Sequence, residues 1–163
     1  MIRTGLAPTA RGALPPEPRA HLASPATRAV LEVQNRVLIT TRAFLHGRGF
    51  TEILPPVIGP VTDPGARGAK QVDIDYYGHR YKLMTSAILY KQASLTVFDK
   101  IFCIAPNVRL EPLETASTDR HLAEFHQIDV EAAGASREEI TRLVEELVGQ
   151  VIRQVVARLP EQL

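Results

Sequence analysis

Two neighbouring segments with alternating polar and apolar side chains constrain the fold of this 163-residue chain most strongly. In the first, 107–111, the odd-numbered positions are polar and the even-numbered positions are apolar. After eight residues, Pro112 to Asp119, the run 120–131 alternates again. Its apolar face carries Leu122, Ile128 and Val130, and its other face carries His121, Phe125, Gln127 and Asp129. Because successive side chains of a strand point to opposite faces of a sheet, these segments predict a hairpin with one polar face.

Two long amphipathic helices are predicted on either side of these strands in the sequence. Apolar residues recur at helical spacing from Thr27 to His46, with Pro25 near the start and Gly47 just past the end. A second apolar stripe continues to about Arg158 and begins at Ser136, which with Glu139 has capping-box spacing. Together these segments predict an α+β fold, in which an antiparallel sheet is flanked by helices.

Shorter elements are predicted between the first helix and the hairpin. Apolar patterning, turn residues and prolines indicate their limits. They are a strand at 50–54, an exposed loop at 57–71, a hairpin of 72–76 with 80–84 around Gly78 and His79, a helix capped by Ser86 that runs to about Val97, and a strand at 101–104 buried on both faces.

Composition limits the kind of protein this is. The first 25 residues hold five prolines and little apolar periodicity, so we predict a flexible arm at 1–25 ahead of a folded domain at 26–163. No apolar run approaches the ~20 residues that span a bilayer. The 19 basic and 18 acidic residues form no basic cluster suited to nucleic acid. Cys103 is the only cysteine, which excludes an internal disulfide and favours a reducing, cytoplasmic location.

The polar face of the predicted hairpin has the residue types that bind a nucleoside triphosphate. Arginine can grip phosphate oxygens with two hydrogen bonds, histidine can donate to an outer phosphate, an aromatic ring can stack on a base, and a carboxylate can accept from an exocyclic amine. The periodicity by itself favours a solvated sheet surface with an Arg–Glu pair and a phenylalanine covered by a helix, so both interpretations stay open at this point. The residues are Arg109, Glu111, His121, Phe125 and Gln127.

Three segments resemble class II aminoacyl-tRNA synthetases of the aspartyl/asparaginyl subclass. The segment 49–56 (GFTEILPP) resembles motif 1, and NVRLE at 107–111 with RHLAEFHQID at 120–129 resembles motif 2. Between them, TSAILYKQ at 85–92 resembles the amino-acid-binding segment. Within this family, the resemblance is closest to archaeal-type asparagine synthetases, which are stand-alone relatives. Motif 3, the glycine-rich segment with a late arginine, is not found in residues 1–163.

The resemblance implies roles for the motif 2 residues. Arg109 matches the arginine that contacts the α-phosphate and the reacting carboxylate, and it is the catalytic candidate. Glu111 matches the glutamate near the adenine amine, and Phe125 matches the ring that stacks on adenine. His121 matches a position that reaches the terminal phosphate.

A second set of residues matches the amino-acid pocket of the family. Lys91 corresponds to the lysine that pairs with the side-chain carboxylate of aspartate, and Ser86 lies in the same segment. Gln127 lies near the pocket. Asp63 lies near the position of the glutamate that grips the substrate ammonium, although Pro64 can also occupy that position.

These matches imply the N-terminal half of an ATP-dependent, aspartate-activating ligase that adenylates its substrate and then forms an amide. A companion chain would supply motif 3, and the magnesium ligands are expected outside this chain, so no metal site is assigned to it. The expected partners are ATP, aspartate or a related dicarboxylic amino acid, and either a second copy of this chain, a companion chain that carries motif 3, or both; a membrane and tRNA are not expected. Two alternatives are a non-catalytic dimerisation or regulatory module and a fragment of an asparaginyl- or aspartyl-tRNA synthetase.

Overall fold

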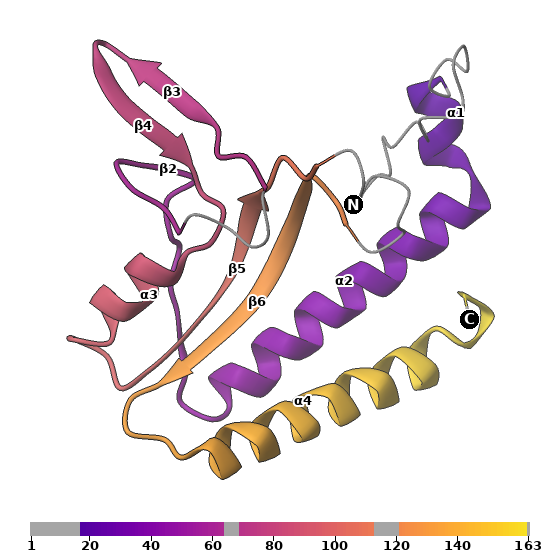
Figure 1. Ribbon diagram of the computed structural model, residues 1–163. Helices are drawn as coiled ribbons and strands as arrows, with labels where there is room; N and C mark the ends of the chain where they lie inside the picture. Colours follow the sequence, from indigo (N-terminus) through magenta and orange to yellow (C-terminus); the bar gives the residue numbers. More distant parts are fainter. Residues whose placement is uncertain (1–16, 64–68, 113–120, 163) are drawn as a thin grey trace. The chain divides into compact units, whose positions relative to one another are not determined.

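The computed structural model describes residues 17–63, 69–112 and 121–162 (Figure 1). They form two compact units. One unit contains the described residues of Glu52–Glu131, and the other contains those of Leu14–Thr51 and Ala132–Leu163. We call them the sheet unit and the helical unit, and we describe each by itself.

The first sheet confirms that the two alternating segments pair, although the first strand ends at Val108 and the second begins at Glu124, so residues 109–111 and 121–123 lie outside both strands. Its strand order is β1 (Thr51–Glu52), β5 (Lys100–Val108) and β6 (Glu124–Ala132), and β5 and β6 run antiparallel in Figure 1. Ile101, Phe102 and Cys103 are at most 1% exposed, as predicted for a strand buried on both faces. Burial raises the pKa of the Cys103 thiol to about 11, so this cysteine stays protonated and unreactive at neutral pH.

The sequence predicts separate strands at 101–104 and 107–111, and Pro106 between them lacks the N–H that a central strand needs. The structure shows one continuous strand that contains Pro106. The Arg109 N–H donates to Ala123 O on the β6 side, whereas the Val108 N–H donates to Met84 O on the other side. Pro106 is two residues before Val108, so its backbone nitrogen also points away from β6. Since β1 is only two residues long, that side of β5 has no continuous ladder for the proline to interrupt.

The second sheet has the order β2 (Ile58–Gly59), β4 (His79–Leu83) and β3 (Asp73–Tyr76). It confirms the hairpin predicted from 72–84. The turn, however, is at Tyr77 and Gly78, whose φ angles of +52° and +78° suit a two-residue hairpin loop. The prediction of a loop throughout 57–71 is wrong at β2. Gly59 lets the β2 backbone lie close to the Tyr90 side chain, because an added Cβ at this position would lie 2.7 Å from Tyr90 Oη.

The helical unit contains α1 (Pro18–Ala23), α2 (Pro25–His46), α4 (Arg137–Arg158) and the short 3₁₀ helix η2 (Pro160–Gln162). Both long helices confirm the sequence prediction, and α2 starts two residues early because Ser24 caps it by accepting from the Thr27 N–H at 3.2 Å. The predicted flexible arm is wrong at α1, where the Glu17 carboxylate caps the first turn. Residues 1–16 of that arm lie outside the described residues. Within the described parts of the chain, no helix is long and apolar enough to cross a bilayer.

The capping box at the start of α4 yields a stability prediction. Ser136 Oγ accepts from the Glu139 N–H at 3.3 Å, and Glu139 Oε2 accepts from the Ser136 N–H at 2.8 Å. Replacing an N-cap serine by alanine costs about 1 kcal/mol. We therefore expect Ser136→Ala to lower the free energy of unfolding by about that amount in urea titrations followed by circular dichroism. Glu145→Ala, on an exposed stretch of the same helix, should change it by less than about 0.5 kcal/mol; equal losses would contradict the capping role.

Candidate active site

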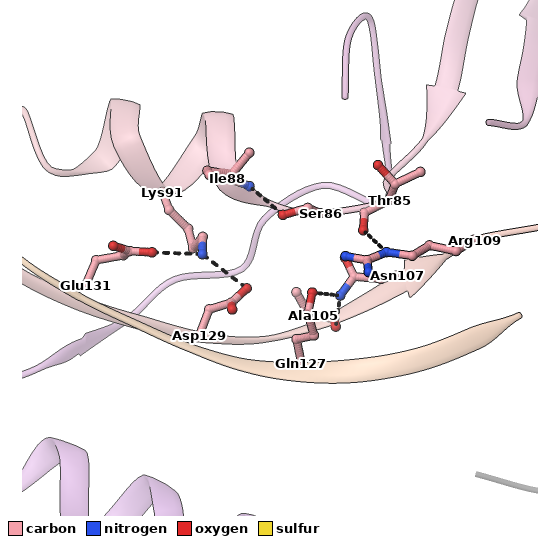
Figure 2. Close-up of polar contacts among 10 residues, drawn as sticks. All are labelled: Thr85, Ser86, Ile88, Lys91, Ala105, Asn107, Arg109, Gln127, Asp129 and Glu131. Atoms are coloured by element: carbon pink, nitrogen blue, oxygen red, sulfur yellow. Dashed lines mark hydrogen bonds and ion pairs between the residues drawn. The ribbon is translucent and has the colours of Figure 1, made fainter. Parts of the chain in front are cut away.

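A row of polar side chains lies along one face of β5 and β6 (Figure 2). At its centre Asn107 is fully buried, and its Nδ2 donates to Gln127 Oε1 at 2.8 Å. The odd-numbered positions of β6, from Phe125 to Glu131, are half-buried on this face, whereas Leu122 and Ile128, from the predicted apolar face, are 37% and 38% exposed. In the sheet unit the polar face is therefore the more covered one. The reason is that α3 (Ile88–Ser94) and the segment before it place side chains over this face.

Arg109 lies at one end of the row, just beyond the end of β5. Its Nε donates to the backbone oxygen of Thr85 at 3.0 Å, and its guanidinium carbon lies 5.1 Å from the centroid of the Phe125 ring. The two residues thus lie together, as the alternation predicts. The hydrogen bond to Thr85 fixes the direction of the guanidinium and uses only one of its five N–H groups, so the others can bind an anion.

Thr85 is itself held by the segment at residues 62–63. The Thr85 N–H donates to Thr62 Oγ1 at 3.0 Å, the two hydroxyl oxygens lie 3.1 Å apart, and Thr85 Oγ1 donates to the backbone oxygen of Asp63. Gln71 Nε2 also donates to Asp63 O, at 3.3 Å. Thr85 is only 1% exposed, so these contacts are shielded from water. A chain of hydrogen bonds therefore connects the Asp63 backbone to Arg109.

Lys91 lies at the opposite end of the row and is 7% exposed. Its Nζ lies 2.8 Å from Glu131 Oε1 and 3.3 Å from Asp129 Oδ2. Burial by itself lowers the pKa of Lys91, but the hydrogen bond to Glu131 and the charge of Asp129 outweigh it and the pKa is raised. The pairing of these two carboxylates with Lys91 was not predicted from the sequence. With one cation and two anions, this cluster has a net charge of −1.

The remaining predicted site residues have less defined places. Glu111 lies three residues beyond the end of β5, where its N–H donates to Arg109 O at 2.9 Å, so strict alternation no longer places its side chain. His121 is exposed and precedes β6. Ser86 Oγ accepts from the Ile88 N–H at 3.3 Å, but the N-cap of α3 is Ala87, which makes no side-chain capping bond, and the helix ends at Ser94; the predicted cap at Ser86 and the predicted end near Val97 are therefore wrong. The loop 113–120 lies outside the described residues.

The row offers two chemically different ends. The Arg109 end presents a cation beside an aromatic ring, which suits a phosphate next to a base. The Lys91 end presents a buried ammonium that is already paired. Among the described residues no group of three or more His, Cys, Asp or Glu is placed to hold a metal ion, and the acids nearest the row are engaged by Lys91. The described residues therefore do not fit a resident metal, and no step is assigned to one.

Several residues of this polar row and its surroundings were not identified as site residues from the sequence. Asp129 and Glu131 continue the spacing of Phe125 and Gln127, so the alternation contained a signal for the face they occupy. Their pairing with Lys91 depends on the placement of α3, which local patterning does not give. Thr62 had no signal, because its segment was predicted to be a loop.

Comparison with known proteins identifies the family. The family model for class II tRNA synthetases (D, K and N) matches residues 17–162. An aspartate–tRNA(Asp/Asn) ligase of Deinococcus radiodurans is 41% identical over 112 residues, which are 69% of this chain and 25% of that protein. An asparagine–tRNA ligase of Pelotomaculum thermopropionicum is 31% identical over 147 residues, which are 89% of this chain and 33% of that protein.

Solved structures agree with these matches. Asparaginyl-tRNA synthetase from Pyrococcus horikoshii, in complex with asparaginyl-adenylate, has a TM-score of 0.79 and 26% identity over 88% of this chain and 32% of that chain. The chain thus spans a third or less of the length of these relatives. Their names include tRNA, which the sequence analysis did not expect as a partner, and none of them is an asparagine synthetase. By its sequence and its α+β fold, this chain belongs to the class II tRNA synthetases and is related to their aspartyl/asparaginyl subclass.

Proposed function

We propose that this chain forms the nucleotide-binding and amino-acid-binding face of an ATP-dependent ligase that activates aspartate. The observation that carries the proposal is the row from Arg109 and Phe125, through Asn107 and Gln127, to Lys91 on one sheet face. In the activation step, a carboxylate oxygen of the amino acid attacks the α-phosphorus of ATP. The bond to the β-phosphate breaks, pyrophosphate leaves, and an aminoacyl-adenylate forms.

Arg109 contributes to this step by charge and by position. Its guanidinium can bind the α-phosphate and the incoming carboxylate together, which neutralises charge and orients the reactants. Since Thr85 already fixes the Nε side, little reorganisation is needed on binding. Phe125 would stack on the adenine, Glu111 would accept from its amine, and His121 would reach the outer phosphate.

Lys91 would distinguish a side-chain carboxylate from an amide at the other end, with Ser86 and Gln127 near the substrate and Asp63 facing its ammonium. The incoming carboxylate must share Lys91 with Asp129 and Glu131. Glu131 is the more accessible, with 35% of its side chain exposed against 16% for Asp129. We infer that the substrate carboxylate replaces Glu131 at the Lys91 ammonium, whereas Asp129 stays paired and keeps the ammonium in place.

The full activity involves more than the described residues. The proposal includes residues 26–163 as part of a catalytic domain, a cytoplasmic location, association with itself or with a companion that carries motif 3, and Mg²⁺ bound with ATP by that companion. The names of the relatives make tRNA the acceptor to test first. The resemblance to tRNA synthetases of this subclass implies glutamines in the segment matched by Thr85–Ile88, and this segment has none, which favours a second candidate, amide formation with ammonia. Incubation of the reconstituted complex with each acceptor, followed by product analysis, distinguishes the two.

Nucleotide binding tests the Arg109 end. Stacking on an aromatic ring is worth roughly 1–3 kcal/mol per base, and a hydrogen bond to a charged group about 1.5–3 kcal/mol. Phe125→Ala and Arg109→Ala should therefore each weaken ATP binding about tenfold in calorimetric titrations, and Arg109→Ala should also abolish aspartate-dependent pyrophosphate exchange by the reconstituted complex. Tyr77→Ala removes an 86% exposed ring on the β3–β4 turn and should bind as the wild type does. Wild-type affinity in both site variants would favour the dimerisation-module alternative.

Substrate selection tests the Lys91 end. Lys91→Met removes the only cation of its cluster and should abolish aspartate binding while ATP affinity changes less than twofold. Glu131→Gln removes a competing carboxylate and should strengthen aspartate binding several-fold. Lys82→Met, which breaks a more exposed ion pair with Asp73, serves as the control. If aspartate binds equally well to the Lys91 variant, the proposed role of Lys91 is wrong.

The charge on Lys91 also predicts a pH dependence of stability. Removing one partner from a buried ion pair typically costs 3–5 kcal/mol; because Glu131 is partly exposed, we expect about 2 kcal/mol for Lys91→Met at pH 7. The folded pKa of Lys91 is raised above its ordinary value of 10.5, so this contribution is present below pH 10.5 and disappears as the pH rises through the folded pKa. Urea titrations from pH 7 to 12 should show that the difference in free energy of unfolding between the wild type and Lys91→Met shrinks above pH 10.5. A difference that grows there would contradict the ion-pair assignment.

A further inference from the structure

A groove with an excess of positive charge lies in the helical unit, where α2 and α4 run side by side (Figure 1). Its volume is about 730 Å³, and residues of both helices line it. Three of these are arginines, Arg36, Arg48 and Arg153, and the only acidic lining residue is Glu146. All belong to one compact unit, and none belongs to the polar row on β5 and β6.

The three arginines are not equally available. Arg48 is engaged, because its Nη2 lies 2.6 Å from Glu146 Oε2 and its guanidinium lies 3.6 Å above the centre of the Phe44 ring. Arg153 donates from Nη2 to Gln150 Oε1 at 3.1 Å, which is a neutral partner. Arg36 Nε is buried, and no described acceptor lies within hydrogen-bond distance of it. The groove therefore has an arginine whose hydrogen-bond partner is neutral, Arg153, and an unsatisfied buried donor, Arg36 Nε.

We propose that this groove binds a small phosphate-bearing molecule through Arg36 and Arg153. A buried donor without an acceptor costs about 1–3 kcal/mol, which an anionic oxygen at Arg36 Nε would recover. The planar guanidinium donates two parallel hydrogen bonds that match phosphate oxygens. The volume lies within the usual 300–1,000 Å³ of small-molecule sites and exceeds what one phosphate group fills. Phe44 and Ile39 add an apolar wall for the remainder of the ligand.

Calorimetric titration of the 163-residue chain with inorganic pyrophosphate tests this proposal. Binding should persist in Arg109→Ala, which separates the groove from the nucleotide site of the proposed function. Arg36→Gln and Arg153→Gln should each weaken it about tenfold, and raising the salt concentration should weaken it further. Arg36→Lys keeps the charge but lacks Nε, so it should lose an intermediate amount. Arg142→Gln, on an exposed position of α4, should bind within twofold of the wild type.

A parallel titration with AMP, run on the Arg109→Ala/Phe125→Ala variant so that the sheet face does not contribute, identifies the source of the phosphate. Tighter binding of AMP than of pyrophosphate would indicate a nucleotide, and the reverse would indicate an inorganic polyphosphate; both outcomes support the site. Equal pyrophosphate affinity in the wild type, Arg36→Gln and Arg153→Gln, with folding verified by circular dichroism, would overturn it. Loss of the binding signal in Arg109→Ala would assign pyrophosphate to the sheet face and also overturn it. A change of oligomeric state in Arg36→Gln, with no pyrophosphate binding by the wild type, would assign the groove to a protein interface instead.

Discussion

The hydrogen bond from Arg109 Nε to the backbone oxygen of Thr85 is the interaction on which the candidate site depends. An arginine just beyond the end of a strand has many rotamers, and fixing it costs conformational entropy. Here folding already orders the group that fixes the arginine, because Thr85 is buried and is held by Thr62 and Asp63. The guanidinium is consequently oriented beside Phe125 before any ligand arrives.

This arrangement connects the two substrates of the proposed reaction. Asp63, the candidate for the substrate ammonium, holds Thr85 through its backbone oxygen, and Thr85 holds the residue proposed to bind the α-phosphate. At the other end of the row, Asp129 and Glu131 keep the buried Lys91 charged. The sheet positions its binding groups through hydrogen bonds and ion pairs within one compact unit.

Much of this fold can be predicted from periodicity. Strand alternation gave the shared face of Arg109 and Phe125, and helical spacing with a capping box gave α4, because both signals are local. The continuity of β5 through Pro106 was not predicted, since the effect of that proline depends on how far the neighbouring strand β1 extends. Thr62 and the partners of Lys91 were missed because they depend on contacts between segments distant in sequence. The family resemblance supplied the chemistry that periodicity alone left open between a nucleotide site and a solvated surface.

The most direct test of the central claim is to locate a bound nucleotide on the chain. Photo-crosslinking with 8-azido-ATP, followed by peptide mass spectrometry, reports which residues lie next to the adenine. If adenine stacks on Phe125, labelling is expected in β6 near Phe125, competed by ATP and reduced in Phe125→Ala. Labelling confined to peptides of α2 and α4, with none in β6, would contradict the assignment of the nucleotide to the sheet face.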